Sequence, residues 1–388
     1  MTSLKDLFLL DPDVVFLNHG SFGATPRPVF DMYQDWQRRL ERQPVRFIVT
    51  EVPGHLRQAR QALAVYLGAS AEDLVFVPNA TTGVNIVARS MRLGPGDEVL
   101  ASDHEYGACD NAWEFICRKT GAAYARQPIP LPTSSPEEIV EHFWRGVTPR
   151  TRVIFLSHIT SPTALQMPVE VICHWAREAG ILTLIDGAHA PGQISLDLGA
   201  IGADFYTGNL HKWAMGPKGS AFLHTRREMQ GLLEPLIVSW GWGENSPSSS
   251  GSTYLDYFEW SGTTDPSAYL ATPAAIQFQA DHDWHSVRRR CHELAQQAVH
   301  RICELTGLAP LCPDNAGMYH QMAIAPLPPV GDLPGFKSGL YSDYRVEIPC
   351  FQWKDRQLIR VSVQGYNTQA DIDALLAALE DLLPKVKS

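Results

Sequence analysis

The sequence is short of charge and offers no cysteine framework. Only 19% of its 388 residues are charged, against roughly 25% in an average globular chain, whereas 45% are apolar. This composition excludes a disordered or coiled-coil protein. The seven cysteines are an odd number, and no two have C-x-x-C spacing, which argues against a disulfide framework and against a zinc site.

Basic surface and targeting segments are also missing. The net charge is −10, and the lysines and arginines are scattered, so no basic face is available to a nucleic acid or an anionic membrane. The first residues lack the apolar stretch and cleavage site of a signal peptide. No window of about 18 apolar residues is present that could span a membrane. We therefore expect a cytoplasmic protein with neither a nucleic-acid nor a membrane partner.

Short apolar runs alternate with helical patterns between about residues 72 and 225. The runs are continuous rather than alternating, which is typical of strands with helices on both sheet faces. This pattern predicts an α/β fold with a mostly parallel central sheet. Strands are expected at 74–77, 98–100, 122–126, 153–156 and 181–185, and helices at 81–91 and 108–119.

After Lys212 the pattern changes to that of a smaller α+β unit. A chain of this length also favours two domains over one. We predict an N-terminal arm, a large domain and a small C-terminal domain, over 1–20, 21–272 and 273–388. Within the second half we expect a loop at 241–253, a helix at 267–280 and a further loop at 326–335.

Three segments carry candidate chemistry. Thr81 and Thr82 follow a strand and open a helix, where exposed N–H groups make a phosphate seat, although such a start is also an ordinary helix cap. Asp186 ends a buried apolar strand, the place where open α/β sheets bind ligands. An ionised carboxylate there needs a partner, unless the side chain only caps the next turn.

The third segment contains Lys212 between His211 and Trp213, after another apolar strand. A lysine in this setting is poorly explained as a solvated surface charge. Lysine becomes a nucleophile when it is desolvated or lies near another cation. A lysine that forms an imine, an aspartate that pairs with a pyridinium nitrogen and a helix-end phosphate seat together describe pyridoxal 5′-phosphate (PLP).

At this point the chain resembles a known family. The segments FLNHGSFG, DHEYGA and SHITSPTAL, at 16–23, 103–108 and 157–165, are similar to class V aminotransferases. This group of fold-type I PLP enzymes includes cysteine desulfurases and isopenicillin N epimerase, and the likeness is strongest to isopenicillin N epimerase-like proteins. The resemblance implies an aspartate aminotransferase-like fold in which the large domain binds PLP.

The resemblance also implies roles for individual residues. Lys212 would carry the internal aldimine and shuttle the Cα proton through a quinonoid carbanion, Asp186 would keep the pyridinium protonated, and His189 would bond the phenolic oxygen. Ring stacking falls to His104 or Tyr106, of which we favour Tyr106. The positions that match phosphate-side residues of the family are Thr81, Thr82, Asn209 and His211.

On the substrate side, Arg360 matches the arginine that grips the α-carboxylate. A planar guanidinium suits a carboxylate bidentately; an edge-strand charge is the alternative. Arg46 is a weaker candidate for a substrate-facing cation, and Ser21 of the first motif is a further substrate-side candidate. Thr263 lies in a segment similar to the loop that reaches the neighbouring subunit's phosphate, which implies a homodimer with shared sites.

Departures from the family pattern bear on the reaction. The loop that carries the desulfurase nucleophile has no cysteine here, and the apolar context of Cys350 favours a structural role. Ser161 replaces an asparagine near the phenolic oxygen. We read the 282–285 segment, His-Asp-Trp-His, as helix capping and packing, not as a metal site. Tryptophans 240, 242, 260 and 353 are expected in the core rather than in a pocket.

The sequence therefore predicts a PLP-dependent enzyme acting on the Cα of an amino acid. Epimerisation or racemisation and transamination need the same residues. The alternatives are a C–S lyase or desulfurase-like enzyme and, in another class, a non-catalytic PLP-fold regulator.

Overall fold

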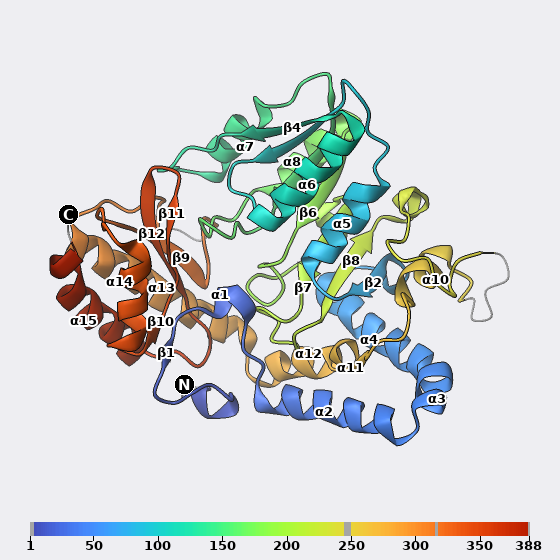
Figure 1. Ribbon diagram of the computed structural model, residues 1–388, viewed down its shortest axis with the longest axis horizontal. Helices are drawn as coiled ribbons and strands as arrows, with labels where there is room; N and C mark the ends of the chain where they lie inside the picture. Colours follow the sequence, from blue (N-terminus) through green and yellow to red (C-terminus); the bar gives the residue numbers. More distant parts are fainter. Residues whose placement is uncertain (1–3, 244–249, 315–316, 387–388) are drawn as a thin grey trace.

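A large twisted sheet forms the centre of the molecule (Figure 1). In the computed structural model, which describes residues 4–243, 250–314 and 317–386, this sheet has seven strands in the order β2-β8-β7-β6-β5-β3-β4. Only β8 runs antiparallel to its neighbours, so the predicted mostly parallel sheet is confirmed. The bounds are β2 Leu74–Val77, β3 Glu98–Ser102, β4 Ala123–Gln127, β5 Thr151–Ser157, β6 Leu182–Asp186, β7 Phe205–Asn209 and β8 Ala221–Thr225.

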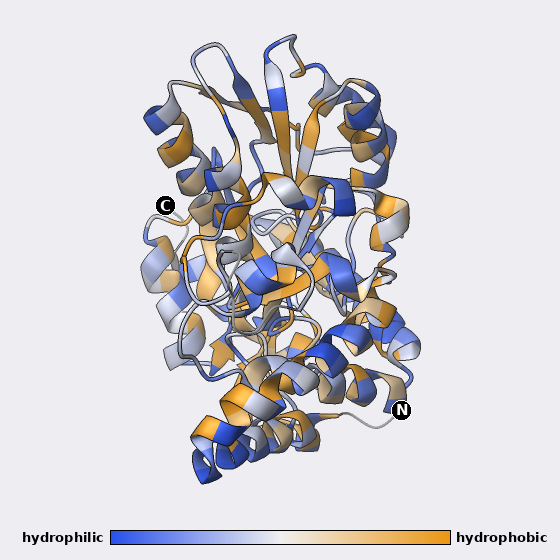
Figure 2. Cartoon of the chain, turned by 90° about the vertical axis from the view of Figure 1, so that its right-hand side faces the viewer, coloured by the Kyte–Doolittle hydropathy of each residue, from blue (hydrophilic) through white to orange (hydrophobic). Residues whose placement is uncertain are grey.

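The continuous apolar character of these strands has a direct structural cause. Along β5, Ile154 and Leu156 belong to one hydrophobic cluster, while Val153 and Phe155 belong to a second cluster. Successive side chains of a strand point to opposite faces, so both faces of the sheet are packed against apolar partners. In Figure 2 the strands of the sheet are accordingly mostly orange, whereas the outer helices carry more blue.

The helices between these strands begin and end near the predicted residues. α5 spans Ala80–Ser90, α6 spans Gly107–Thr120 and α8 spans Val169–Glu178. Asn79 caps α5, its Oδ1 accepting from the Thr82 N–H at 2.8 Å, which satisfies one of the orphan donors of the first turn. The short α1 (His19–Phe22) precedes the longer α2 (Arg27–Arg42) and α4 (Val52–Leu67).

The C-terminal part is an α+β unit, as predicted. Within its described residues, three antiparallel strands have the order β11-β12-β9. They span Cys350–Trp353, Arg356–Ser362 and Met322–Leu327 and lie beside α13 (Trp284–Thr306), α14 (Leu333–Ser342) and α15 (Gln369–Val386). The N-terminal strand β1 (Val15–Phe16) pairs in parallel with β10 (Val346–Glu347), so the arm lies against this unit. The domain boundaries at residues 20 and 272 stay predictions.

Two local predictions are wrong. The helix expected at 267–280 is divided into α11 (Ser267–Leu270) and α12 (Thr272–Asp281), because Pro273 lacks the backbone N–H that would bond to the Tyr269 carbonyl in a continuous helix. The loop expected at 326–335 already contains the start of α14, where Asp332 accepts from the Gly335 N–H at 2.9 Å. Of the loop predicted at 241–253, residues 244–249 lie outside the described residues, and α10 (Thr253–Glu259) begins at its end.

Membrane spanning can be checked against the helices themselves. None of those in the described part of the chain is both long enough and apolar enough to cross a bilayer.

Candidate active site

A cavity of about 330 Å³ opens where β6 and β7 end and α5 begins. Its walls come from α1, from the β2–α5 junction and from the segments that follow β5, β6 and β7. It brings together most of the residues that the sequence singled out. Those lining it are Ser21, Thr81, Tyr106, Asp186, His189, Asn209, His211 and Lys212.

Lys212 follows β7 and directs its amine to the middle of this group. Its Nζ lies 3.1 Å from His189 Nε2. Burial disfavours the ammonium form and lowers the pKa of Lys212 to about 8; Asp186 opposes this shift and Arg360 adds to it. Since the ordinary lysine pKa is about 10.4, a far larger share of this amine is unprotonated at neutral pH, as a nucleophile requires.

Asp186 is the last residue of β6 and is buried. Its Oδ1 accepts from the Ala188 N–H at 2.8 Å, and the Cys109 thiol lies 3.5 Å from Oδ2. Burial raises the pKa of this carboxyl. Capping of the next turn therefore accounts for Oδ1 only. Among the described residues Asp186 forms no ion pair. A buried carboxylate in this state is suited to a cationic ring nitrogen from a ligand.

The start of α5 is tied to the end of β7. Asn209 Oδ1 accepts from the Ala80 N–H at 2.8 Å, which fixes the helix N-terminus at the cavity. Thr81 lines this cavity, whereas Thr82 lines the neighbouring one. His211 is beside them, and burial lowers its pKa to about 4. A helix N-terminus with adjacent hydroxyls is suited to a phosphate group.

The structure separates the two candidates for ring stacking. Tyr106 lines the cavity and is 47% exposed. His104 is fully buried elsewhere: Nδ1 lies 2.7 Å from Thr163 Oγ1, and Nε2 lies 2.9 Å from the Ile129 carbonyl. Trp353 packs on the His104 ring, and of the two candidates Tyr106 is the one among the residues that line the cavity; its stacking role stays a prediction.

Arg360 lies on β12, the central strand of its sheet, so the edge-strand alternative is wrong. Its guanidinium donates to the Ser161 carbonyl at 2.6 Å and to Ser21 Oγ at 3.2 Å. Both serines line the cavity. Among the described residues the buried Nε of Arg360 has no hydrogen-bond partner. Such an orphaned donor is costly, and a substrate carboxylate at this place would satisfy it.

Two further predicted residues lie outside this cavity. Arg46 is exposed on α3 (Pro44–Arg46), where its Nε donates to Glu51 Oε1 at 3.0 Å. Arg46 is not among the residues that line this cavity, and its role as a substrate-facing cation stays a prediction. Thr263 is exposed in the loop between α10 and α11, and its predicted contact with a neighbouring subunit stays a prediction.

Sequence reasoning missed a buried acid behind the cavity wall. Glu105 accepts hydrogen bonds from Ser102 Oγ at 2.5 Å, and from the Ser157 N–H and Oγ at 2.8 and 2.6 Å. Burial, with a smaller effect from Asp186, raises the pKa of Glu105 to about 8. The sequence contained a signal for this residue, since Glu105 lies between His104 and Tyr106, the two candidates for ring stacking. Phe22, 74% exposed at the cavity wall, was missed as well.

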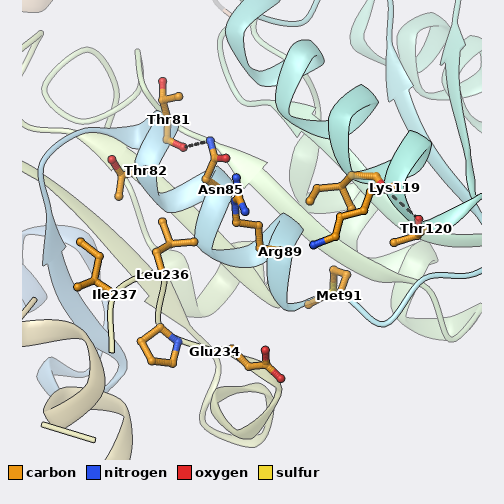
Figure 3. Close-up of a pocket in the computed structure, with 12 residues that line it drawn as sticks. Thr81, Thr82, Asn85, Arg89, Met91, Lys119, Thr120, Glu234, Leu236 and Ile237 are labelled. Carbon is orange, nitrogen blue, oxygen red and sulfur yellow. Dashed lines mark hydrogen bonds between the residues drawn. The ribbon is translucent and has the colours of Figure 1, made fainter. Parts of the chain in front are cut away.

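A second cavity, of about 720 Å³, lies beside α5 (Figure 3) and shares Thr81 with the first. Arg89 of α5 and Lys119 of α6 line it opposite the segment that contains Glu234 and Leu236. Exposed apolar side chains continue along this segment, namely Leu236, Ile237, Val238, Trp240 and Trp242. The core prediction for the two tryptophans is therefore wrong, with 71% of Trp240 and 57% of Trp242 exposed.

The remaining sequence candidates have structural roles. Asp283 caps α13 by accepting from the Ser286 N–H, as the capping interpretation predicts. The part of the chain that the structure describes contains no cluster of three or more acidic, histidine or cysteine side chains suited to a metal ion. Cys350 is buried in β11, and burial raises the pKa of its thiol to about 12, which makes it a poor nucleophile. Trp353 packs on His104.

The donor set of the first cavity fits PLP. It combines a lysine amine of lowered pKa, a buried carboxylate that has no ion pair among the described residues, and a helix N-terminus. These are the groups that the aldehyde, the ring nitrogen and the phosphate of PLP require. The buried guanidinium of Arg360 lies behind two serines of the cavity wall.

Comparisons with known proteins agree with this chemistry. The family model for class V aminotransferases matches residues 21–325. Isopenicillin N epimerase of Amycolatopsis lactamdurans is 41% identical over 384 residues, which cover 96% of each chain. A probable chloroplastic L-cysteine desulfhydrase of Arabidopsis thaliana is 29% identical over 407 residues, which cover 96% of this chain and 84% of that protein.

Among solved structures, a mutant of C-DES with glycine covalently linked to its PLP cofactor has the same fold. The TM-score is 0.82 at 22% sequence identity, over 96% of this chain and 97% of that one. The expected fold of the type I PLP enzymes is thereby confirmed.

Proposed function

The chain belongs to the class V aminotransferase family and is a PLP-dependent enzyme, and from this premise we propose that it epimerises an amino-acid substrate at Cα. The observation that carries the proposal is the convergence of Lys212, His189 and Asp186 in one cavity of a chain 41% identical to an isopenicillin N epimerase. We take isopenicillin N, named for that relative, as the first substrate to test.

The residues that would hold the cofactor follow from their chemistry. Asp186 would keep a proton on the ring nitrogen, and His189 would bond the phenolic oxygen. Tyr106 would cover the ring, and Thr81 with the α5 N-terminus would bind the phosphate. Thr82, Asn209 and His211 are proposed for the phosphate side as well. When bound, PLP supplies an electron sink that makes the Cα–H bond of an attached amino acid acidic.

The substrate carboxylate would be bound by Arg360. Its Nε is buried and unsatisfied among the described residues, while its two terminal nitrogens are oriented by Ser161 and Ser21. A carboxylate at Nε would gain a charge-assisted hydrogen bond in a site of low dielectric. This contact would orient the Cα–H bond toward the catalytic base.

Lys212 would move the proton. Its amine has a pKa of about 8, so it can both accept and return a proton near neutral pH, which is the condition for general acid–base catalysis. Epimerisation additionally requires that the proton returns to the opposite face of Cα. Return of the proton to the cofactor instead would give transamination.

The deciding experiment is incubation of the enzyme with isopenicillin N in D₂O, with chiral analysis and mass spectrometry of the product. We expect inversion at the amino-bearing Cα together with incorporation of one deuterium. Lys212→Ala is the matched control, and it should lose both the reaction and the borohydride-fixed cofactor adduct. A keto product without inversion, or no turnover on any amino acid, would overturn the proposal; the latter would indicate a regulator.

A C–S lyase is the second candidate, because a 29% identical relative is a probable L-cysteine desulfhydrase. Release of sulfide, pyruvate and ammonia from L-cysteine, without epimerisation, would select it. The buried thiol of Cys350 speaks against a desulfurase that passes sulfur through this residue. Sulfide release that survives Cys350→Ala would indicate lyase chemistry.

We also propose a homodimer in which Thr263 reaches the phosphate of the neighbouring subunit, and a cytoplasmic location. The exposed apolar segment 236–242 beside the second cavity supports the dimer, because large apolar patches on a surface commonly mark protein interfaces.

A further inference from the structure

His189 lies between two nitrogen atoms of neighbouring residues. The indole Nε1 of Trp213 is 3.2 Å from His189 Nδ1, and the Lys212 Nζ is 3.1 Å from His189 Nε2. Both contacts are of hydrogen-bond length. The direction of each bond can be worked out from the chemistry of the three side chains.

The indole N–H is a donor only, so the Nδ1 of His189 must accept. A neutral imidazole carries one proton, which then has to be on Nε2. A donor at Nε2 requires an acceptor at Nζ, and a lysine nitrogen accepts only when it is a neutral amine. We propose that Trp213 is a positioning residue whose indole N–H fixes His189 as the Nε2–H tautomer and thereby presents Lys212 as a free amine.

The alternative arrangement is unfavourable. If the Nδ1 of His189 carried the proton, the indole N–H of Trp213 would lose its acceptor, and both residues are buried. An unsatisfied donor in such a place is strongly disfavoured. Burial and nearby Lys212 keep the pKa of His189 well below its ordinary value, so the ring is neutral, as the tautomer requires.

Trp213 is itself held in place. Its ring packs on His19 at a centroid distance of 5.0 Å, and His19 Nε2 donates to the Lys212 carbonyl at 3.0 Å. The Cα of Gly192 approaches the backbone of Trp213 so closely that a Cβ would lie 2.1 Å from its carbonyl oxygen. The indole N–H therefore has little freedom to leave His189.

Other charged and titratable groups also act on this pair. They come from α6, β6, β12, α1 and the Lys212 segment, and they are Cys109, Asp186, Arg360, His19 and His211. None of these groups is altered when only the indole N–H is removed. A change in the titration of Lys212 or in the tautomer of His189 therefore reports the contribution of Trp213.

The first test is ¹⁵N NMR of the full-length protein labelled at histidine, in the holoenzyme and after cofactor removal. We expect His189 to be protonated at Nε2 and unprotonated at Nδ1. Trp213→Phe, and benzothienylalanine placed at position 213, both remove the N–H; the second keeps the ring shape. Both should move the proton partly or fully to Nδ1. A wild-type ring protonated at Nδ1 would overturn the inference.

The second test measures Lys212 in the cofactor-stripped chain, by the rate of reductive methylation at different pH values and peptide mass spectrometry. With Nε2 free to accept, the ammonium form gains a partner. In both Trp213 variants, the pH at which Lys212 is methylated at half its maximal rate should therefore rise by about one unit. The methylation rate at pH 7 should fall about tenfold. Unchanged midpoints in both variants would contradict the inference.

Trp113→Phe is the matched control, since Trp113 is buried and its indole nitrogen has no partner among the described residues; it should leave the midpoint unchanged. If Trp213→Phe fails to fold, the benzothienylalanine protein decides. The inference deepens the proposed function and rests on the role given there to Lys212. Failure of the protein to bind PLP would refute that function. The tautomer of His189, measured in the cofactor-free protein, would still decide this inference.

Discussion

At the scale of single residues, burial is the main source of reactivity in this site. It lowers the pKa of Lys212 and raises that of Asp186, although the two residues have opposite charges. Both shifts increase the share of the neutral form relative to the same group in water. Among the residues that the structure describes, the same burial leaves the Nε of Arg360 without a partner. The site therefore carries an energetic cost that the cofactor and the substrate can offset.

Replacement of Arg360 by lysine tests the carboxylate contact. Lysine lacks the planar fork and cannot reproduce a bidentate contact, so we expect KM for the amino-acid substrate to rise roughly tenfold to a hundredfold. Steady-state kinetics measure this. Arg356→Lys, on the same strand but with its guanidinium bonded to the Leu131 carbonyl, should leave KM near wild type. Equal KM values for both variants would refute the role of Arg360.

Glu105→Gln tests the buried acid through the pH dependence of stability. Its folded pKa is about 8 and its unfolded value is about 4.3. The native state keeps a proton that the unfolded state releases, so the contribution to stability is full below pH 4.3 and is lost as the pH rises through 8.

Urea unfolding of the wild type and Glu105→Gln at pH 5 and pH 8 measures this effect. The free energy of unfolding of the wild type should fall relative to the variant by roughly 2–4 kcal/mol between these values. Glu141→Gln, at an exposed position of α7 (Pro136–Trp144), controls for loss of one carboxyl. A difference that does not vary with pH would contradict the prediction.

At the scale of elements, the sequence was most informative where one physical cause dominates. β2, β3, β5 and β6 could be predicted because burial on both faces demands unbroken apolar runs, whereas β8 was not predicted. Asp186 and Lys212 could be located because each follows such a run. The choice between His104 and Tyr106 could not be made from pattern alone, since the two are separated by one residue and both are suitable for stacking.

Elements of the C-terminal unit were harder to foresee. β11 contains Gln352, and only some of its side chains are buried, so it lacks the continuous apolar signal of the central strands. α14 has Pro334 in its first turn, a residue that reads as loop although it is well tolerated there. Propensity is a weak guide when tertiary contacts decide.

Gly192→Ala tests the close approach that holds the segment after Lys212. The glycine has φ +89°, and an added Cβ would lie 2.1 Å from the Trp213 carbonyl oxygen. We expect a loss of at least about 2 kcal/mol in stability together with weaker cofactor retention, measured by urea unfolding and by absorbance after dialysis.

Gly307→Ala is the matched control. Its φ is +73°, but apart from its chain neighbours no atom of the described residues lies within 4 Å of the added Cβ, so it carries backbone strain without the clash. It should cost about 1 kcal/mol and leave cofactor retention unchanged. Identical retention in the two variants would show that the clash does not reach the site.

At the scale of the whole molecule, many histidines are buried in neutral form. Burial lowers the pKa of His19 and His158 to about 3, and of His104, His211, His224 and His320 to about 4. The unfolded chain binds protons at these side chains from about pH 6.5 downward. Stability is therefore full above pH 6.5 and is lost as the pH falls toward 4 and 3.

We expect the free energy of unfolding of the cofactor-stripped chain to decrease by several kcal/mol between pH 6.5 and 4.5. In His224→Gln the free energy of unfolding should vary less steeply with pH, because about one proton fewer is taken up on unfolding. His285→Gln, at an exposed position, controls for loss of an imidazole. Urea midpoints across this range provide the measurement, and a flat profile would refute the prediction.

The proposed dimer can be tested on the exposed apolar segment. Ile237→Asp places a charge where 56% of an isoleucine is exposed, and it should shift the protein to a monomer and weaken cofactor retention. Light scattering with size-exclusion chromatography measures the mass. Val171→Asp on α8, where 42% of the valine is exposed, should leave the mass unchanged; a monomeric wild type would refute the dimer.

The contact between Ser21 and Arg360 joins residues 339 positions apart, and His19 meets Tyr366 across 347. During synthesis on a ribosome, Lys212 and Asp186 emerge long before Arg360, the proposed carboxylate-binding residue. A nascent polypeptide could thus hold a nearly finished sheet yet be unable to recognise an amino acid. Competence would come only when the last strand folds back onto the first helix, so premature termination would yield no partially active product.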